Sequence, residues 1–131
     1  MNLIVDSSAV IALIAAEPEA ARIRNRLLAE GSRPAMAAPN HLEILMVLAG
    51  RHGDSRAIVD RLLDAFGIAI VPFSAELVIP AQEAFLRFGK GRHPAKLNFG
   101  DCIAYALARS LDAPLLFKGG DFALTDIVPA L

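Results

Sequence analysis

The stretch MNLIVDSSAVIALI, residues 1–14, places an aspartate between a short apolar run and a longer one. Leu3–Val5 is too short for a helix and is typical of a parallel strand that is buried on both faces. Asp6 would then stand at the carboxyl end of that strand, and one of the two serines after it can cap a helix over residues 9–16. Because ligands bind beyond the carboxyl ends of the strands in open parallel sheets, this position favours a functional role for Asp6.

Strands and helices alternate along the rest of the chain. Further strands are predicted at residues 35–38, 68–71 and 114–117, with a last apolar piece at 127–128. Helices are predicted at about 19–30, 41 to 50 or 53, 56–67, 74–88 and 98–112, and Pro80 should kink the fourth of these or move its start later. The alternation predicts an α/β fold with a central parallel sheet of four to five strands, covered by helices on both faces, in a single domain over residues 1–131.

Composition and charge exclude several classes of protein. The chain is 55% hydrophobic with no Trp, which predicts a folded core of small and aliphatic side chains. Its 13 Lys and Arg against 14 Asp and Glu argue against a nucleic-acid binder that relies on a bulk positive field. One cysteine allows no intramolecular disulfide, and no segment resembles a signal peptide or a membrane span. We therefore expect a cytoplasmic protein without membrane contact.

Four acidic side chains fall at the carboxyl-end edge of the predicted sheet. Asp6 follows the first strand, Glu43 and Asp101 lie in the first turns of two helices, and Asp121 follows the fourth strand. Two carboxylates about 4 Å apart repel by roughly 4 kcal/mol at an effective dielectric of 20, so a converging cluster needs protons or cations. Carboxylate ligands suit Mg²⁺ or Mn²⁺, which can activate water and stabilise the leaving oxygen of a phosphodiester. These four acids are therefore predicted to bind metal and to be catalytic.

Each acid also has a purely structural explanation. Segments 40–43 and 98–101 both match the Asn-x-x-acid pattern of a capping box, in which the acid accepts a hydrogen bond from a helix-end amide. Asp6 before two serines matches an Asx-type turn, and Asp121 after two glycines matches a turn residue. The joint placement of the four acids at one predicted edge favours a functional site, but the alternatives stay open at this point.

Several segments resemble the PIN-domain nucleases, most closely the VapC toxins of prokaryotic toxin–antitoxin pairs. They are DSSAVIAL (6–13), the helix around Glu43, LNFGDCIAYALA (97–108) and PLLFKGGDFALTDI (114–127), of which the last two are the most distinctive. The resemblance implies a three-layer α/β/α PIN-like fold, Mg²⁺ or Mn²⁺ in an acidic pocket, cleavage of transfer or ribosomal RNA, a homodimer, and inhibition by a cognate VapB-like antitoxin. It matches the family's acidic site to Asp6, Glu43, Asp101 and Asp121.

Residues outside the acidic set receive weaker predictions. The resemblance matches Ser8 to a small hydroxyl residue near the metal, and Asn98 can hold the outer shell of the pocket, although both can simply cap helices. Arg92 and Lys96, in the basic loop GKGRHPAKL, either position RNA phosphates or are merely solvated. Lys118 either contacts an RNA phosphate or pairs with a carboxylate.

Two functions follow from these patterns. The favoured hypothesis is a metal-dependent endoribonuclease that leaves a 5′ phosphate and a 3′ hydroxyl. The alternative is a catalytically weak PIN-fold module that acts by forming a complex with an antitoxin-like partner, for which the apolar segment 1–28 offers a docking surface. P-loop, GxGxxG and GxSxG motifs are absent, so nucleotide hydrolysis, dinucleotide binding and serine-hydrolase chemistry lack support.

Overall fold

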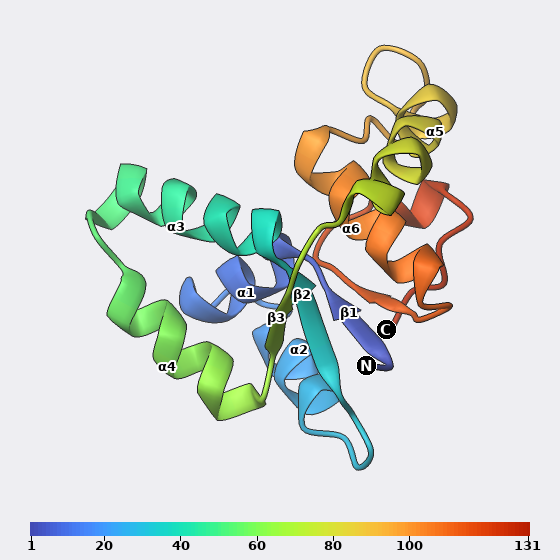
Figure 1. The fold of residues 1–131 in the computed structure, drawn as a ribbon. Coiled ribbons are helices and arrows are strands. Elements are labelled where there is room, and N and C mark those ends of the chain that lie inside the picture. The colour runs from blue at the N-terminus through green and yellow to red at the C-terminus, as the bar shows by residue number, and fades with distance from the viewer.

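A computed structural model describes residues 1–131 as a sheet between two layers of helices (Figure 1). The strands are β1 (Leu3–Val5), β2 (Pro34–Ala37), β3 (Ala69–Val71) and β4 (Leu115–Leu116). The helices are α1 (Ser7–Ile14), α2 (Ala20–Leu27), α3 (Ala38–His52), α4 (Arg56–Phe66), α5 (Val78–Phe88) and α6 (Phe99–Ser110), with short 3₁₀ helices η1 (Ala75–Leu77) and η2 (Phe122–Leu124).

The four strands are all parallel and lie in the order β3-β2-β1-β4. The first strand of the chain is therefore an inner strand, and Ile4 pairs with Ala35 on one side and Leu115 on the other. The last apolar piece forms no fifth strand. It makes only an isolated bridge to the edge strand β4, in which the Leu115 amide donates to the Val128 carbonyl at 2.9 Å and the Ala130 amide donates to the Leu115 carbonyl at 2.9 Å.

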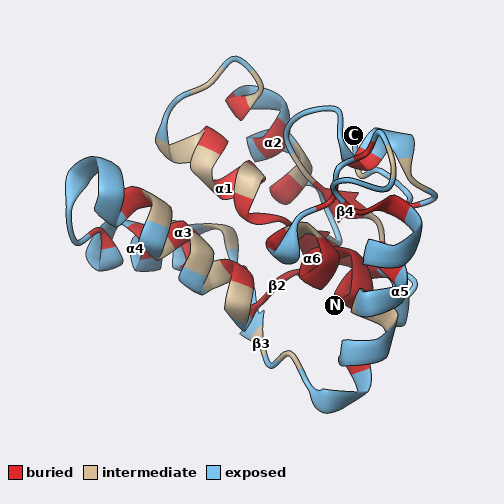
Figure 2. Ribbon diagram, turned by 90° about the horizontal axis from the view of Figure 1, so that it is seen from above, coloured by how far each residue is buried: buried red, intermediate tan, exposed pale blue.

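Two hydrophobic cores lie on opposite faces of the sheet. Side chains alternate between the faces of a strand, so Ile4 joins the core under α5 and α6, while Leu3 and Val5 join the core under α1 to α4. Helix α6 is buried over most of its length, as Figure 2 shows, and Cys102 is one of its core residues. The predicted α/β fold, with a central parallel sheet covered on both faces, is confirmed.

Several helix boundaries differ from the sequence prediction. Helix α1 begins at Ser7, with Asp6 itself as the N-cap, instead of beginning after a capping serine. Helix α3 begins at Ala38, and Pro39 occupies its first turn, where a proline is well tolerated because the missing amide has no partner there. Glu43 consequently lies in the second turn of α3 and not in the first. Pro80 lies in the first turn of α5, which begins after η1, so the predicted later start is confirmed.

The first two helices turn most of their apolar side chains inward. Val10, Ile23 and Leu27 are buried, whereas Leu28 is 60% exposed. The segment that was expected to offer a docking surface therefore mainly covers the sheet. None of the helices combines the length and the apolar character that crossing a bilayer requires.

Candidate active site

Asp6 is held at the junction of β1 and α1. Its amide donates to the Leu116 carbonyl at 2.9 Å, which continues the pairing of β1 with β4. One carboxylate oxygen, Oδ2, accepts from the Ser8 amide at 3.0 Å and so caps α1. The residue is only 2% exposed, and its second oxygen, Oδ1, is buried without a hydrogen-bond partner. The sheet and the helix together fix this carboxylate in place.

The surroundings of Asp6 disfavour its charged form. Burial is the main cause and raises the pKa of Asp6 from 3.8 to about 7, with smaller increases from the charges of Asp101 and Glu43. Hydrogen bonds from Ser8 act in the opposite direction. The charges of two acids from distant parts of the chain thus act on Asp6.

Glu43 extends from α3 toward Asp6 and Asp101, and these three acids together form the acidic corner of the molecule. The partly buried carboxylate accepts a hydrogen bond at Oε1 from the Ser7 hydroxyl, with an oxygen–oxygen distance of 2.5 Å. Ser8 was predicted from the resemblance and Ser7 was not, because the direction in which each serine points depends on the first residue of α1. Ser8, whose amide binds Asp6, has a hydroxyl that accepts from the Lys118 amide at 3.0 Å and links α1 to the segment after β4.

Asp101 lies in the first turn of α6 and closes a capping box with Asn98. The Asp101 amide donates to Asn98 Oδ1 at 2.9 Å, and the Asn98 amide donates to Asp101 Oδ2 at 3.0 Å. The pKa of Asp101 is raised, mainly by partial burial and further by the charges of Glu43 and Asp121, against the Asn98 hydrogen bond. Capping and membership of the acidic cluster are therefore compatible in one side chain. Segment 40–43 forms no such box, because α3 begins before it.

Asn40 is a polar residue of this corner that was predicted only as a helix cap. It is 1% exposed, and its Nδ2 donates to the Gly100 carbonyl at 3.0 Å, which joins α3 to the first turn of α6. Its Oδ1 is buried without a partner. The contact spans 60 residues of chain, so no local sequence pattern could have indicated it.

Three carboxylates of the cluster share one feature. In each, one oxygen accepts a hydrogen bond from the protein and the other accepts none; the free oxygens are Oδ1 of Asp6, Oε2 of Glu43 and Oδ1 of Asp101. As they are placed, no three His, Cys, Asp or Glu side chains are grouped closely enough to hold a metal ion. The donor set nevertheless fits a hard divalent cation by its chemistry: oxygen donors only, mutual repulsion, and an orphaned buried oxygen on Asp6.

Asp121 lies at the margin of the cluster. It is exposed just before η2, and its charge acts on Asp101 but is not among the influences on Asp6. The nearby acid Asp126 is engaged elsewhere: it accepts a hydrogen bond from the Tyr105 hydroxyl and lies 3.4 Å from the Arg87 guanidinium. The structure therefore brings three of the four predicted acids together and leaves the fourth exposed beside them.

The predicted RNA-contact residues differ in their surroundings. The guanidinium of Arg92 lies over the Phe85 ring, 5.8 Å from its centroid, and Lys96 is exposed on the same loop. The Lys118 ammonium forms an ion pair with Glu17 at 2.9 Å. Lys118 thus pairs with a carboxylate, one of its two anticipated roles, although that carboxylate is not one of the four predicted acids.

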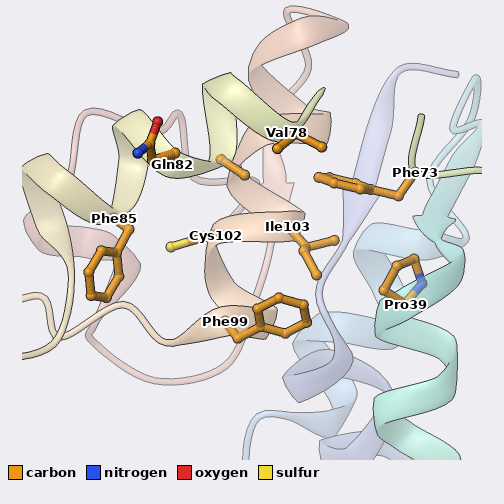
Figure 3. A pocket seen from close by; sticks show the side chains of 9 residues that line it. Pro39, Phe73, Val78, Gln82, Phe85, Phe99, Cys102 and Ile103 are labelled. Atoms are coloured by element: carbon orange, nitrogen blue, oxygen red, sulfur yellow. The ribbon is translucent and has the colours of Figure 1, made fainter. Parts of the chain in front are cut away.

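An apolar groove of about 510 Å³ lies between α5, α6 and the start of α3. Figure 3 shows Phe73, Phe85 and Phe99 around it, with Gln82 as its polar side chain. Phe99 is 82% exposed and directly precedes Gly100 in α6. Since Pro39 lines the groove and directly precedes Asn40, one end of the groove adjoins the acidic corner.

Comparison with known proteins gives matches over nearly the whole chain. A family model for the PIN domain matches residues 3–128. Ribonuclease VapC36 of Mycobacterium tuberculosis is 47% identical over 126 residues, covering 95% of this chain and 91% of the relative. The crystal structure of Mycobacterium tuberculosis VapC20, described as a sarcin–ricin loop cleaving toxin, has a TM-score of 0.76 at 19% identity and covers 97% of both chains. A toxin–antitoxin complex from Klebsiella pneumoniae has a TM-score of 0.71 at 18% identity and covers 99% of this chain and 98% of its own.

Proposed function

The chain belongs to the PIN-domain family, among the VapC ribonucleases, and from this premise we propose that it is a metal-dependent endoribonuclease that acts as the toxin of a toxin–antitoxin pair. The observation that carries the proposal is the acidic corner, where Asp6, Glu43 and Asp101 each keep one oxygen free of protein hydrogen bonds. Its substrate is RNA, of the transfer or ribosomal class.

Asp6, Glu43 and Asp101 would hold Mg²⁺ or Mn²⁺, with Asp121 as a further ligand from the rim. The bound cation would supply positive charge that activates a water molecule and stabilises the oxygen leaving the phosphodiester. Each protein ligand would be presented by a rigid element: Asp6 by the end of β1, Glu43 by α3 and Asp101 by the capped start of α6. Without the cation, Asp6 exchanges a proton near neutral pH, since its pKa is about 7.

The basic loop, residues 89–97, is the proposed binding site for the RNA backbone. Arg92 and Lys96 are exposed and, in this proposal, bind phosphates without reading bases. Lys118 would first have to leave Glu17, so its contribution to RNA binding is expected to be smaller than that of Arg92.

Two protein partners belong to the proposal: a cognate VapB-like antitoxin and a second copy of the chain. The antitoxin is supported by the Klebsiella pneumoniae complex, which has the same fold. Large apolar side chains that stay exposed on α3, α5 and α6 support association with protein; they include Met46, Ile79 and Phe99. The proposed place of action is the cytoplasm, where the RNA substrates are.

The test is cleavage of total cellular RNA by purified protein, freed of antitoxin, with Mg²⁺ or Mn²⁺ and with EDTA. Asp101→Asn should abolish cleavage while keeping the fold, because the amide oxygen can still accept the Asn98 hydrogen bond. Asp60→Asn, an exposed acid on α4, is the matched control and should cleave like the wild type. Fragment ends should carry 5′ phosphates and 3′ hydroxyls.

Either of two results would contradict the proposed chemistry. Cyclic phosphate ends would indicate attack by the RNA 2′ hydroxyl. If the wild type and Asp101→Asn behaved alike with either metal, catalysis at this corner would be excluded, and the chain would be a binding module that acts through its antitoxin-like partner.

A further inference from the structure

Gly100 occupies a position where a side chain has no room. A Cβ atom added to it would lie 2.7 Å from Oε1 and 2.8 Å from Cδ of Glu43, and closer still to Oε2. The backbone of Gly100 is not in the left-handed region, so its conformation does not require glycine. The Glu43 carboxylate therefore occupies the space that a side chain at position 100 would need.

Asn40 fastens the same two helices at this point. It lies three residues before Glu43, so both side chains project from one face of α3 toward the first turn of α6. Its amide group donates to the carbonyl of Gly100 itself, at 3.0 Å. The Asn40 hydrogen bond thus fixes the separation between α3 and α6 at Gly100, the residue whose missing Cβ leaves room for Glu43. The next residue of α6 is Asp101.

We propose that Gly100 is a positioning residue, which acts through Glu43 to set the affinity of the acidic corner for a divalent cation. The inference rests on the proposed function, because it assumes that Glu43 is a metal ligand. Its physical basis is steric: with alanine at position 100 the Glu43 carboxylate must leave the position in which the Ser7 hydroxyl now holds it. The atoms that must move are the end of a flexible side chain, so the fold should tolerate the change.

The test compares Mn²⁺ binding and unfolding in a set of variants, with free Mn²⁺ followed by electron paramagnetic resonance and unfolding followed in urea with EDTA. Gly100→Ala should weaken Mn²⁺ binding roughly tenfold or more, the range typical of lost support around a metal ligand, while the variant still unfolds cooperatively in urea. Gly50→Ala is the matched control: Gly50 is an exposed glycine in α3 whose added Cβ would contact nothing within 4 Å. It should bind Mn²⁺ like the wild type and unfold at a slightly higher urea concentration.

A double-mutant cycle separates positioning from a general structural role. In a Glu43→Ala background, Gly100→Ala should cause no further loss of Mn²⁺ affinity, since the side chain on which it acts is gone. In Glu43→Asp/Gly100→Ala the shorter acid fits beside the new methyl group, so this variant should bind Mn²⁺ more tightly than Gly100→Ala alone. That rescue also decides the question if Gly100→Ala folds poorly, because the shorter acid should then restore folding.

Three outcomes would overturn the inference. They are wild-type Mn²⁺ affinity in Gly100→Ala, an equal loss with and without Glu43, and no rescue by Glu43→Asp. Failure of the proposed function looks different: the wild type itself would bind no Mn²⁺ and cleave no RNA, whereas failure of this inference alone leaves wild-type binding and cleavage intact.

Discussion

Asp6 is a carboxylate that the fold buries almost completely while leaving one of its oxygens without a hydrogen bond. Its folded-state pKa of about 7 lies above the ordinary value of 3.8, so the folded chain binds this proton more tightly than the unfolded chain does. Between those two values a rise in pH ionises Asp6 in the unfolded state first. Stability contributed by the protonated group is therefore lost as the pH rises toward and through 7.

The first prediction concerns this pH dependence. In EDTA, the free energy of unfolding of the wild type should fall relative to that of Asp6→Asn as the pH rises from 5 to 8, by about 3 kcal/mol, because the variant cannot ionise at this site. Adding Mn²⁺ at pH 8 should stabilise the wild type and not the variant. Urea unfolding across the pH range is the measurement, and a difference between the two proteins that does not change with pH would contradict the assignment.

At the scale of helices and strands, the sequence predicted those helix starts that are fixed by contacts between neighbouring residues. The start of α6 was predictable because Asn98 and Asp101 form a capping box within four residues. The start of α3 was not, because its N-cap, Ala37, makes no side-chain hydrogen bond that could mark it. Because the predicted start of this helix lay too late in the chain, Glu43 was expected in the first turn of α3, whereas it lies in the second.

Contacts between segments that are far apart in the chain could not be predicted from the sequence alone. Asn40 and Gly100 meet only because α3 and α6 pack together, and nothing in either segment indicates the other. The hydrophobic patterns predicted the layers of the fold and the edge of the sheet at which Asp6 stands. They could not show that Ser7 would face Glu43 while Ser8 faces the segment after β4.

The capping box of α6 gives a prediction at this scale. Asn98→Ala should lower the free energy of unfolding by about 1 kcal/mol, because the Asp101 amide loses its acceptor. Asn98→Ser keeps an acceptor oxygen and should lose less than half of that. Urea unfolding of the two variants at pH 7 is the measurement, and equal losses would show that the side-chain cap does not stabilise α6.

At the scale of the whole molecule, the C-terminal tail, residues 127–131, lies along the β4 edge of the sheet. The tail bonds to Leu115 through its backbone, and the Ala130 carbonyl also accepts from Arg26 Nε on α2 at 3.1 Å. Ile127 is 5% exposed in the core under α5 and α6, whereas Val128 beside it is 60% exposed. The tail is therefore part of the folded domain and not an appendage.

Truncating these two neighbours tests the role of the tail. Ile127→Ala should reduce the free energy of unfolding by about 2–4 kcal/mol, since it removes buried methyl groups and leaves a cavity. Val128→Ala is its control and should change the value by less than about 0.5 kcal/mol. Similar losses in both variants, measured by urea unfolding, would mean that the tail does not pack as described.

The strand order has a consequence for how the protein is made. Strand β1 is synthesised before β2 and β4, between which it lies, so the sheet cannot be completed until β4 has been synthesised. Asp6 emerges long before Asp101, and residues 127–130, which bond to β4, emerge later still. A nascent chain therefore lacks an assembled acidic corner until Asp101 has been synthesised. If the finished protein cuts the RNA of the translation machinery, the topology itself spares the ribosome that is still producing it.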